Sequence, residues 1–594
     1  MANYTKGFWA DHWTYIVDLI HGWLAVYPDW EGRILFDTRL PYFFSPAFVK
    51  PRSKKYVLSP TFDGLSKHVR QLDATEDKDL DKFAYMDKFI DSQSGWYELE
   101  ANWQHTKDGK IFLSSPMAKL LVLATVKFAT RDPYGMGIEY EGGRPGWDDA
   151  NNGLVGMIGS GMPEAIELNA LLRLIRSTVS KFAGDLDIPI EAAELMDEIM
   201  EALTALRTSN PVMPDYDDDT GDVGLRVPSH LFRYWDKVAS AREAYREKIK
   251  VTFDGRTQTL ANQEIQSMVS VWIDEIDAGI ERARAFGTQG KDDSGNFDVT
   301  PTYFSYNAVH WTHNGLETNT GLPLVNVTAM EVRVFPMFLE GPARMMKLLD
   351  PNEADDLYRK VRESPLRDEG LGMYTISASL KGQSFDLGRE MAFAPGWLEN
   401  QSVWMHMSYK FYLELIRHDL LDEFFGELHD GGILPFVNAE KYGRSLLECS
   451  SFIASSVFED PDMRGRGFLA RLSGSTAEFL SMWTLMMIGP NPFTLGRNGI
   501  LRFQLLPALP RWLFNDDDDG ENSWVSFKLF GAIEVTYHHH RGAENLYRIP
   551  PTRYVVGFGD GQTINADGPY VEADIADKIR RVVFVTTIDV YFEP

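Results

Sequence analysis

Apolar residues recur with helical spacing along most of the chain up to about residue 490. Near the start, Trp13, Ile16, Ile20 and Trp23 fall on one face of a helix with 3.6 residues per turn. The same spacing predicts helices over residues 116–131, 163–182, 191–207, 228–250, 260–284, 398–425 and 474–488. The spacing therefore predicts that most of the chain is helical.

Long stretches that contain glycine and proline separate these helices, chiefly residues 131–162, 285–326 and 363–398. They exceed ordinary connections, so we expect functional loops at one end of a helical scaffold. After about residue 497 the sequence changes to short β-prone runs such as SWVSFKLFGAIEVTYHHH and RRVVFVTTIDVYF, separated by turn clusters such as DDDDGEN. This texture predicts a helical domain over 1–496 and a small β-sandwich over 497–594.

Composition limits the partners that the chain can have. Its 594 residues include 86 acidic and 59 basic side chains, a net charge of −27, which disfavours nucleic acid and anionic lipid surfaces. Cys449 is the only cysteine, so no intrachain disulfide can form and we expect a cytoplasmic protein. The longest uncharged window near the C-terminus, residues 479–496, is interrupted by Gly489, Pro490 and Pro492, so no membrane span is expected.

The densest group of chemically useful residues lies between residues 139 and 154. Its glycines allow tight turns and close approach to a ligand, and Trp147 offers a flat face suited to a sugar ring. Asp148 and Asp149 are adjacent carboxyls, and their repulsion, together with burial, can keep one of them protonated as a general acid. From composition alone, a polar loop with an Asx turn fits equally well.

Residues 146–153, GWDDANNG, resemble the G-x-W-N-D-x-x-N motif of the inverting β-glycoside phosphorylases of glycoside hydrolase family 94, the clan of cellobiose, chitobiose, laminaribiose and β-1,3-oligoglucan phosphorylases. The resemblance implies that Asp149 is the general acid. It also implies that Trp147, Asp148 and Asn152 contact the sugar, although Asp148 stands where many members have asparagine.

Two further segments are similar to this family. Residues 399–406, ENQSVWMH, resemble its E-N-G-x-x-x-x-H segment, which implies that Glu399 binds substrate and His406 binds phosphate. Residues 471–477, RLSGSTA, resemble its T-G-S/T-A segment, which implies that Ser473 and Gly474 bind phosphate. The position of Ser473 and Gly474 at the predicted start of a helix also favours an anion site, with an ordinary N-cap serine as the alternative.

The chain departs from the family at two phosphate ligands. The family's glutamine after the position of Glu448 is replaced here by Ala454, so Ser455 or Ser456 would have to substitute. No arginine occupies the family's phosphate-binding position, and Arg39, Arg52 and Arg70 are left as candidates that no motif distinguishes.

The resemblance implies an (α/α)6 barrel followed by a small β-sandwich, with the family's N-terminal β-sandwich and first barrel helices missing. It implies phosphorolysis of β-glucosidic bonds in gluco-oligosaccharides, with inorganic phosphate as co-substrate, no cofactor or metal, and release of α-glucose 1-phosphate. The segments KPRSKKYVL, VRQLDA and LSGSTAEFLSMW are most similar to the β-1,3-oligoglucan branch, which favours a β-1,3 linkage. A homodimer, or a partner chain carrying the missing half, is expected on the same basis.

Two alternatives stay open at the level of sequence. One is an inverting glycoside hydrolase, in which Glu448 or Glu399 would activate water as the general base. The other is a non-catalytic carbohydrate-binding subunit that needs a second chain to complete its site.

Overall fold

The computed structural model describes residues 12–61, 64–208, 225–287, 298–432, 438–445, 450–469, 473–516, 522–540 and 544–592. Its helices of ten or more residues are α1 (Tyr15–Leu24), α3 (Pro116–Phe128), α4 (Met162–Phe182), α5 (Ile190–Thr208), α6 (Ser229–Lys248), α7 (Asn262–Gly287), α9 (Pro351–Glu363), α10 (Met405–Arg417) and α13 (Ser473–Met487). Shorter helices are α2 (Leu80–Met86), α8 (Glu340–Met345), α11 (Leu421–Glu427), α12 (Ala439–Tyr442) and α14 (Ala573–Arg580).

Most of the helices expected from periodicity are confirmed within a few residues of their predicted ends. The exception is the helix expected over 398–425. Residues 403–404 form a strand instead, and α10 and α11 are separated at Asp419, which has a positive φ of 55°.

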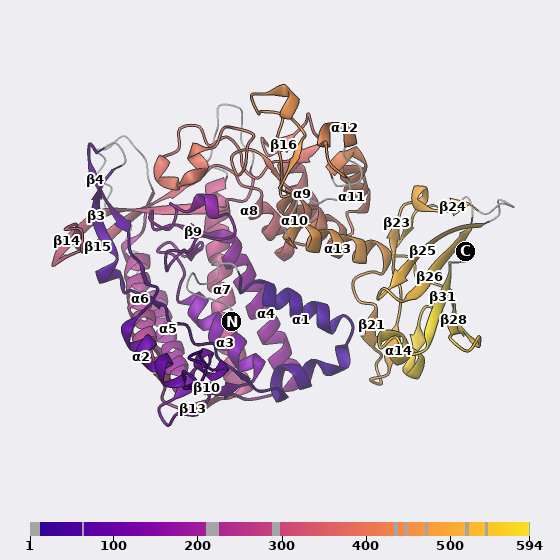
Figure 1. The fold of residues 1–594 in the computed structure, drawn as a ribbon, viewed down its shortest axis with the longest axis horizontal. Helices are drawn as coiled ribbons and strands as arrows, with labels where there is room; N and C mark the ends of the chain where they lie inside the picture. The colour runs from indigo at the N-terminus through magenta and orange to yellow at the C-terminus, as the bar shows by residue number, and fades with distance from the viewer. Residues whose placement is uncertain are drawn as a thin grey trace.

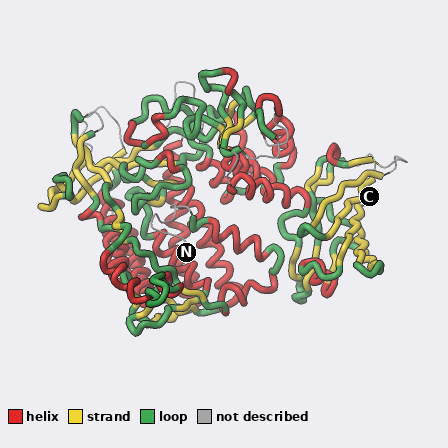
Figure 2. Tube along the Cα trace, in the orientation of Figure 1, coloured by secondary structure: helices red, strands yellow, loops and turns green. Residues whose placement is uncertain are grey.

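The prediction of a mainly α (α/α)6 barrel is wrong. The structure is 42% helical and 25% strand, its strands form many separate sheets, and no closure of helices into a barrel is found in the described parts of the chain. The misplaced expectation came from reading the stretches between helices as loops, because several of them contain strands whose partners lie far away in the sequence. Figure 2 shows strands at both ends of the molecule with most of the helices between them.

A seven-stranded sheet accounts for much of this unexpected strand content. Its order is β4-β3-β15-β14-β9-β8, with β11 paired to β15. Its members are β3 (Tyr56–Pro60), β4 (Lys67–Gln71), β8 (Ile138–Glu139), β9 (Ser160–Gly161), β11 (Leu225–Arg226), β14 (Tyr303–Glu317) and β15 (Pro323–Val334). The strands β14 and β15 form a long hairpin that projects from the molecule beside β3 and β4 (Figure 1). This sheet fixes the loop before α4, because β8 and β9 flank that loop.

The C-terminal part contains a six-stranded sheet in the order β24-β25-β26-β31-β28-β29 and smaller sheets around it. The six strands are β24 (Asn515–Asp516), β25 (Asn522–Leu529), β26 (Ile533–His540), β28 (Arg553–Phe558), β29 (Thr563–Asp567) and β31 (Val585–Phe592). This part follows α13 at one end of the molecule (Figure 1). The boundary at 496/497 remains a prediction.

Helices α10 and α13 run side by side in the same direction. Near their first turns, Lys410 Nζ lies 2.5 Å from Glu478 Oε1. Near their last turns, Arg548 donates to the carbonyls of Ile416 and Leu485 at 3.4 and 2.8 Å. These two connections lie at similar positions along the two helices. The helices are therefore parallel, and their N-termini lie at the same end.

Candidate functional site

Trp147 joins two segments that lie about 250 residues apart in the sequence. Its indole is buried, and its Nε1 donates to Glu340 Oε2 at 2.5 Å. Its ring centre lies 4.3 Å from that of His406 in an edge-on arrangement and 6.2 Å from that of Trp404. The first two motifs identified in the sequence are therefore in direct contact.

Glu340, at the start of α8, is held firmly in place. Tyr303 Oη donates to the same carboxylate oxygen at 3.2 Å. One turn later, Arg344 donates to Glu167 Oε1 at 2.6 Å, and both side chains are buried. Because Glu340 is held in place, the hydrogen bond that it accepts from Nε1 fixes the orientation of the Trp147 ring.

Asp148 is buried and caps the short helix of residues 149–151. Its carboxyl accepts hydrogen bonds from Ala150 N at 3.3 Å and Asn151 Nδ2 at 3.0 Å. Burial, assisted by the nearby carboxyl of Glu399, raises the pKa of Asp148 well above its ordinary value. The raised pKa favours the protonated form of Asp148. The Asx turn considered for this loop is present, and it lies inside the cluster.

Asp149 is more open than its neighbour. Its side chain is 45% exposed, and Oδ1 lies 2.7 Å from Nη2 of Arg389, whose side chain is 50% exposed. Asp149 can therefore meet solvent or a ligand. To donate a proton as a general acid, Asp149 has to give up this ion pair.

The loop between β8 and β9 carries Asp148 and Asp149 and is named the acid loop. The backbone that carries Arg389 is fixed against this loop. Arg389 N donates to Asn152 Oδ1 at 3.1 Å, and Gly153 N donates to Leu387 O at 2.9 Å. A Cβ at Gly153 would lie 1.9 Å from the carbonyl oxygen of Asp386, so only glycine permits this approach. Asn152 thus acts on the loop opposite it, in addition to any contact with sugar.

Two more carboxyls, those of Glu390 and Glu399, complete the group of residues around Asp149, which is named the acid cluster. Glu390 is fully buried, and neither of its carboxyl oxygens has a hydrogen-bond partner in the described structure. Burial, then the neighbouring carboxyls of Asp148 and Glu399, raise the pKa of Glu390 well above its ordinary value. Burial also raises the pKa of Glu399, against the opposing effects of its own backbone N–H and of Arg389. Asp148, Glu390 and Glu399 therefore form a group of carboxyls with raised pKa values beside Asp149.

His406, the second residue of α10, lies in the same cluster. It is buried, and its Nδ1 has no hydrogen-bond partner among the described residues. Burial, together with the positive charges of Lys410 and Arg344, lowers its pKa to about 3, so the ring is neutral in neutral solution. A neutral ring with an unused nitrogen beside a helix N-terminus can bind an anion as donor from that nitrogen.

The third motif lies at the start of α13. The helix begins at Ser473, one residue before the predicted start, but the side-chain surroundings of Ser473 and Gly474 lie outside the described residues. Because α10 and α13 are parallel, the N–H groups at the starts of both helices open at the end where His406 lies. Two helix N-termini at one end favour negative charge there.

The structure distinguishes the three candidate arginines. Arg52 is engaged by Glu243 and Asp236 on α6, and Arg39 donates to a neighbouring carbonyl at the surface. Arg70 instead pairs at 2.6 Å with Asp386, the residue that touches Gly153. Arg70 is thus the candidate that lies beside the acid loop.

Of the other residues considered for the site, Ser456 is occupied, because its hydroxyl donates to Asp368 Oδ1 at 2.6 Å. The hydroxyl of Ser455 is buried without a hydrogen-bond partner in the described structure. Ser455 follows the strand at 452–453, which pairs with the strand immediately before α10. Glu448 lies outside the described residues.

Arg389, Glu390 and Glu340 are members of this cluster that sequence reasoning did not name, and Arg70 was named only as one of three arginines that no motif distinguished. Arg389 and Glu390 lie in the stretch 363–398 that was expected to be a functional loop, so a weak signal existed for them. Glu340 carried no local signal, since only the fold brings it to Trp147.

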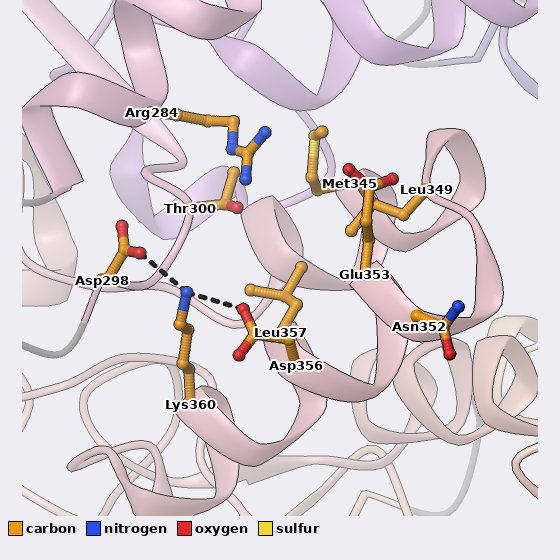
Figure 3. Close-up of a pocket in the computed structure, with 10 residues that line it drawn as sticks. All are labelled: Arg284, Asp298, Thr300, Met345, Leu349, Asn352, Glu353, Asp356, Leu357 and Lys360. Atoms are coloured by element: carbon orange, nitrogen blue, oxygen red, sulfur yellow. Dashed lines mark hydrogen bonds and ion pairs between the residues drawn. The ribbon is translucent and has the colours of Figure 1, made fainter.

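A separate cavity of about 320 Å³ lies between the end of α7 and α9 (Figure 3). Lys360 lines it and pairs with Asp298 and Asp356, each at 2.8 Å. Arg284 and Glu353 also line it, so both signs of charge are present. The residues of the acid cluster do not line this cavity.

Within the described residues, no group of three or more His, Cys, Asp or Glu side chains is arranged to hold a metal ion. Over the same parts of the chain, no helix combines the length and apolar character needed to cross a membrane.

Comparison with known proteins does not identify a family. No family model matches the chain, and no curated protein matches it. Among 29 similar chains of solved structure is an uncharacterized conserved protein from Thermus thermophilus. It is 10% identical, with a TM-score of 0.21 over 68% of this chain and 87% of that chain. A TM-score this low carries no argument about fold or function.

Proposed function

We propose that this chain cleaves β-glucosidic bonds in gluco-oligosaccharides by inverting phosphorolysis, with Asp149 as the general acid and inorganic phosphate as the nucleophile. The observation that carries the proposal is the contact between Trp147 and His406, at 4.3 Å between ring centres. Residues singled out from two motifs about 250 positions apart thus meet in one cluster. A sequence resemblance that arose by chance would not require this contact.

The chemistry requires a proton donor on one side of the glycosidic bond and an anionic nucleophile on the other. Asp149 gives its proton to the glycosidic oxygen, a phosphate oxygen attacks C1 from the opposite face, and the bond from C1 to the glycosidic oxygen breaks. The attack inverts the anomeric centre and yields α-glucose 1-phosphate. Phosphate is already an anion, so the site needs donors that hold it and needs no general base.

The groups suited to hold phosphate are His406 and the N-termini of α10 and α13. The neutral imidazole can donate from the nitrogen that has no partner, and the helix N–H groups supply further donors and a favourable dipole. Arg70 and Arg389 supply positive charge beside the acid loop.

Inverting hydrolysis is the second candidate, and the buried carboxyls favour it. Glu399 lies within electrostatic reach of Asp149, and an inverting hydrolase uses two carboxyls, one as acid and one as base. Burial raises the pKa of Glu399, and a general base works best when its pKa lies near the operating pH, so this shift is compatible with the second candidate. Phosphorolysis stays the first proposal because of the contact between Trp147 and His406.

The test is incubation of the purified chain with laminari-, cello- and sophoro-oligosaccharides, with and without inorganic phosphate, while glucose 1-phosphate and free glucose are assayed. Phosphorolysis predicts glucose 1-phosphate only when phosphate is present, with a loss of about a hundredfold or more in Asp149→Asn. The matched control is Asp277→Asn, because the side chain of Asp277 is 44% exposed and its partners Arg173 and Asn169 lie outside the three motifs. Release of glucose in the absence of phosphate would contradict the proposal and would show that the chain is a hydrolase.

A further inference from the structure

The ion pair between Arg389 and Asp149 poses a chemical problem for the proposed function. A general acid must carry a proton, yet Asp149 accepts a 2.7 Å hydrogen bond from a guanidinium, the partner that suits a charged carboxylate. Burial raises the pKa values of Asp148 and Glu399, the other acidic groups near Asp149. Arg389 is the positively charged group in contact with Asp149.

The pair is built so that the side chain of Arg389 can leave while its backbone stays. The backbone is fixed by the hydrogen bonds from Arg389 N to Asn152 and from Gly153 N to Leu387. The two charged groups are 50% and 45% exposed, and ion pairs at this level of exposure are weak. A guanidinium that binds one carboxylate oxygen can form a stronger, two-pronged contact with a tetrahedral oxyanion.

We propose that Arg389 is an anion-responsive gate, which leaves Asp149 for an incoming tetrahedral oxyanion and so allows Asp149 to take up a proton. This inference rests on the proposed function. Arg389 keeps its charge and exchanges one acceptor for another, and the proton comes from solvent, which reaches the half-exposed carboxyl. Asp149 loses a positive neighbour and gains a negative one, and both changes favour its protonated form.

The gate couples the nucleophile to the acid. Without phosphate, Asp149 stays paired with Arg389 and has no proton to give to the glycosidic oxygen. Water therefore cannot displace the leaving sugar. With phosphate bound, the acid carries its proton and the nucleophile is already in place. The arrangement favours transfer to phosphate over transfer to water.

The experiment counts the protons that accompany anion binding. Sodium sulfate is the probe, since it has the shape and charge of the phosphate dianion and does not titrate near pH 6. Isothermal titration calorimetry at pH 6 in buffers of different ionisation enthalpy gives the number of protons taken up by the protein. We expect an uptake of up to about one proton in the wild type, lost in both Asp149→Asn and Arg389→Gln.

The matched control is Arg173→Gln, because the ion pair of Arg173 with Asp277 has 48% and 44% exposure, close to that of the gate. This variant should bind sulfate with the proton uptake of the wild type. In the oligosaccharide assay, Arg389→Gln should raise KM for phosphate about tenfold or more, as for the loss of a hydrogen bond to a charged ligand, and should increase the share of turnover that goes to water.

The outcomes separate the gate from the proposed function. Sulfate binding with equal proton uptake in the wild type and in Asp149→Asn would overturn the gate and leave the phosphate site intact, as would binding with no uptake. If neither sulfate nor inorganic phosphate binds, the proposed function fails and the gate fails with it.

Discussion

The imidazole of His406 meets the indole of Trp147 edge-on, with ring centres 4.3 Å apart and ring planes 79° apart. The contact places a group expected to bind phosphate against a group expected to bind sugar. In the proposed reaction these two ligands exchange a bond, so their binding residues have to be neighbours. Substitutions in the cluster and at its edges test both this arrangement and its electrostatic surroundings.

His406→Gln should weaken phosphate binding without changing the pH dependence of the reaction. The pKa of His406 is lowered to about 3, so its charge does not change in the neutral range. We expect KM for phosphate to rise about tenfold, as for the loss of one hydrogen bond to a charged ligand, with a smaller change in kcat. Steady-state kinetics across the weakly acid to weakly alkaline range check this, and loss of a limb of the pH profile in the variant would contradict it.

Trp147→Phe should destabilise the fold through Glu340. Phenylalanine keeps an aromatic ring but removes the N–H group that donates to Glu340 Oε2 at 2.5 Å. A buried carboxylate that loses a donor costs about 1–3 kcal/mol in the free energy of unfolding. Urea unfolding measures the effect. Trp483→Phe is the control, because Trp483 is 44% exposed, and it should change stability by less than about 0.5 kcal/mol.

Glu390→Gln should make the protein more stable at alkaline pH. Burial and the carboxyls of Asp148 and Glu399 raise the folded-state pKa of Glu390 well above the value near 4.5 expected in the unfolded chain. The unfolded chain therefore releases this proton first, and wild-type stability falls as pH rises from about 4.5 towards the folded pKa. The variant should therefore exceed the wild type in the free energy of unfolding at about pH 8, with a difference that grows as the pH rises from about 4.5.

Glu167→Gln supplies a control of opposite sign. Burial alone would raise the pKa of Glu167, but the positive charges of Lys347 and Arg344 hold it at about 2. The stability that Glu167 contributes is present above about pH 4.5 and is lost as pH falls towards 2. The variant should therefore be less stable than the wild type at neutral pH, with a difference that shrinks in acid. Unfolding midpoints in urea across the pH range compare both variants, and parallel curves for Glu390→Gln and the wild type would contradict the prediction.

Gly153→Ala should separate the acid loop from the segment that carries Arg389. The added Cβ would lie 1.9 Å from the carbonyl oxygen of Asp386, a backbone atom that cannot move aside alone. We expect a loss of about 1–3 kcal/mol in stability, typical of overpacking, together with a loss of activity. Gly426→Ala, which meets nothing within 4 Å, is the control for thermal unfolding and activity. Equal effects of the two substitutions would contradict a close approach at Gly153.

Helices could be predicted from the sequence because their apolar spacing is local. The large sheet was missed for the opposite reason, since Leu324 pairs with Val57 and Phe304 with Ser160, and such pairings leave no local trace. The run LVNVTAMEVRV in β15 does alternate, so its strand signal was present within a stretch dominated by helices.

The members of the acid cluster divide in the same way. Trp147, Asp148, Glu399 and His406 were named because short motifs resemble those of a known family. Glu340 and Arg70 join them only through tertiary structure, and no spacing rule connects Glu340 to Trp147. Arg389 is identified by its contact with Asp149 at 2.7 Å, and a sequence pattern does not contain that distance.

The side chain of Arg548 lies at the opposite end of α10 and α13 from the acid cluster. It comes from the C-terminal part of the chain and binds the carbonyls of Ile416 and Leu485, close to the last turns of the two helices. A tilt of either helix about that anchor would displace its far end, where His406 and Ser473 lie. The C-terminal sheets therefore support the end of the two helices that is proposed to bind phosphate. A chain ending at residue 496 should lose alignment there without losing a single residue of the acid cluster.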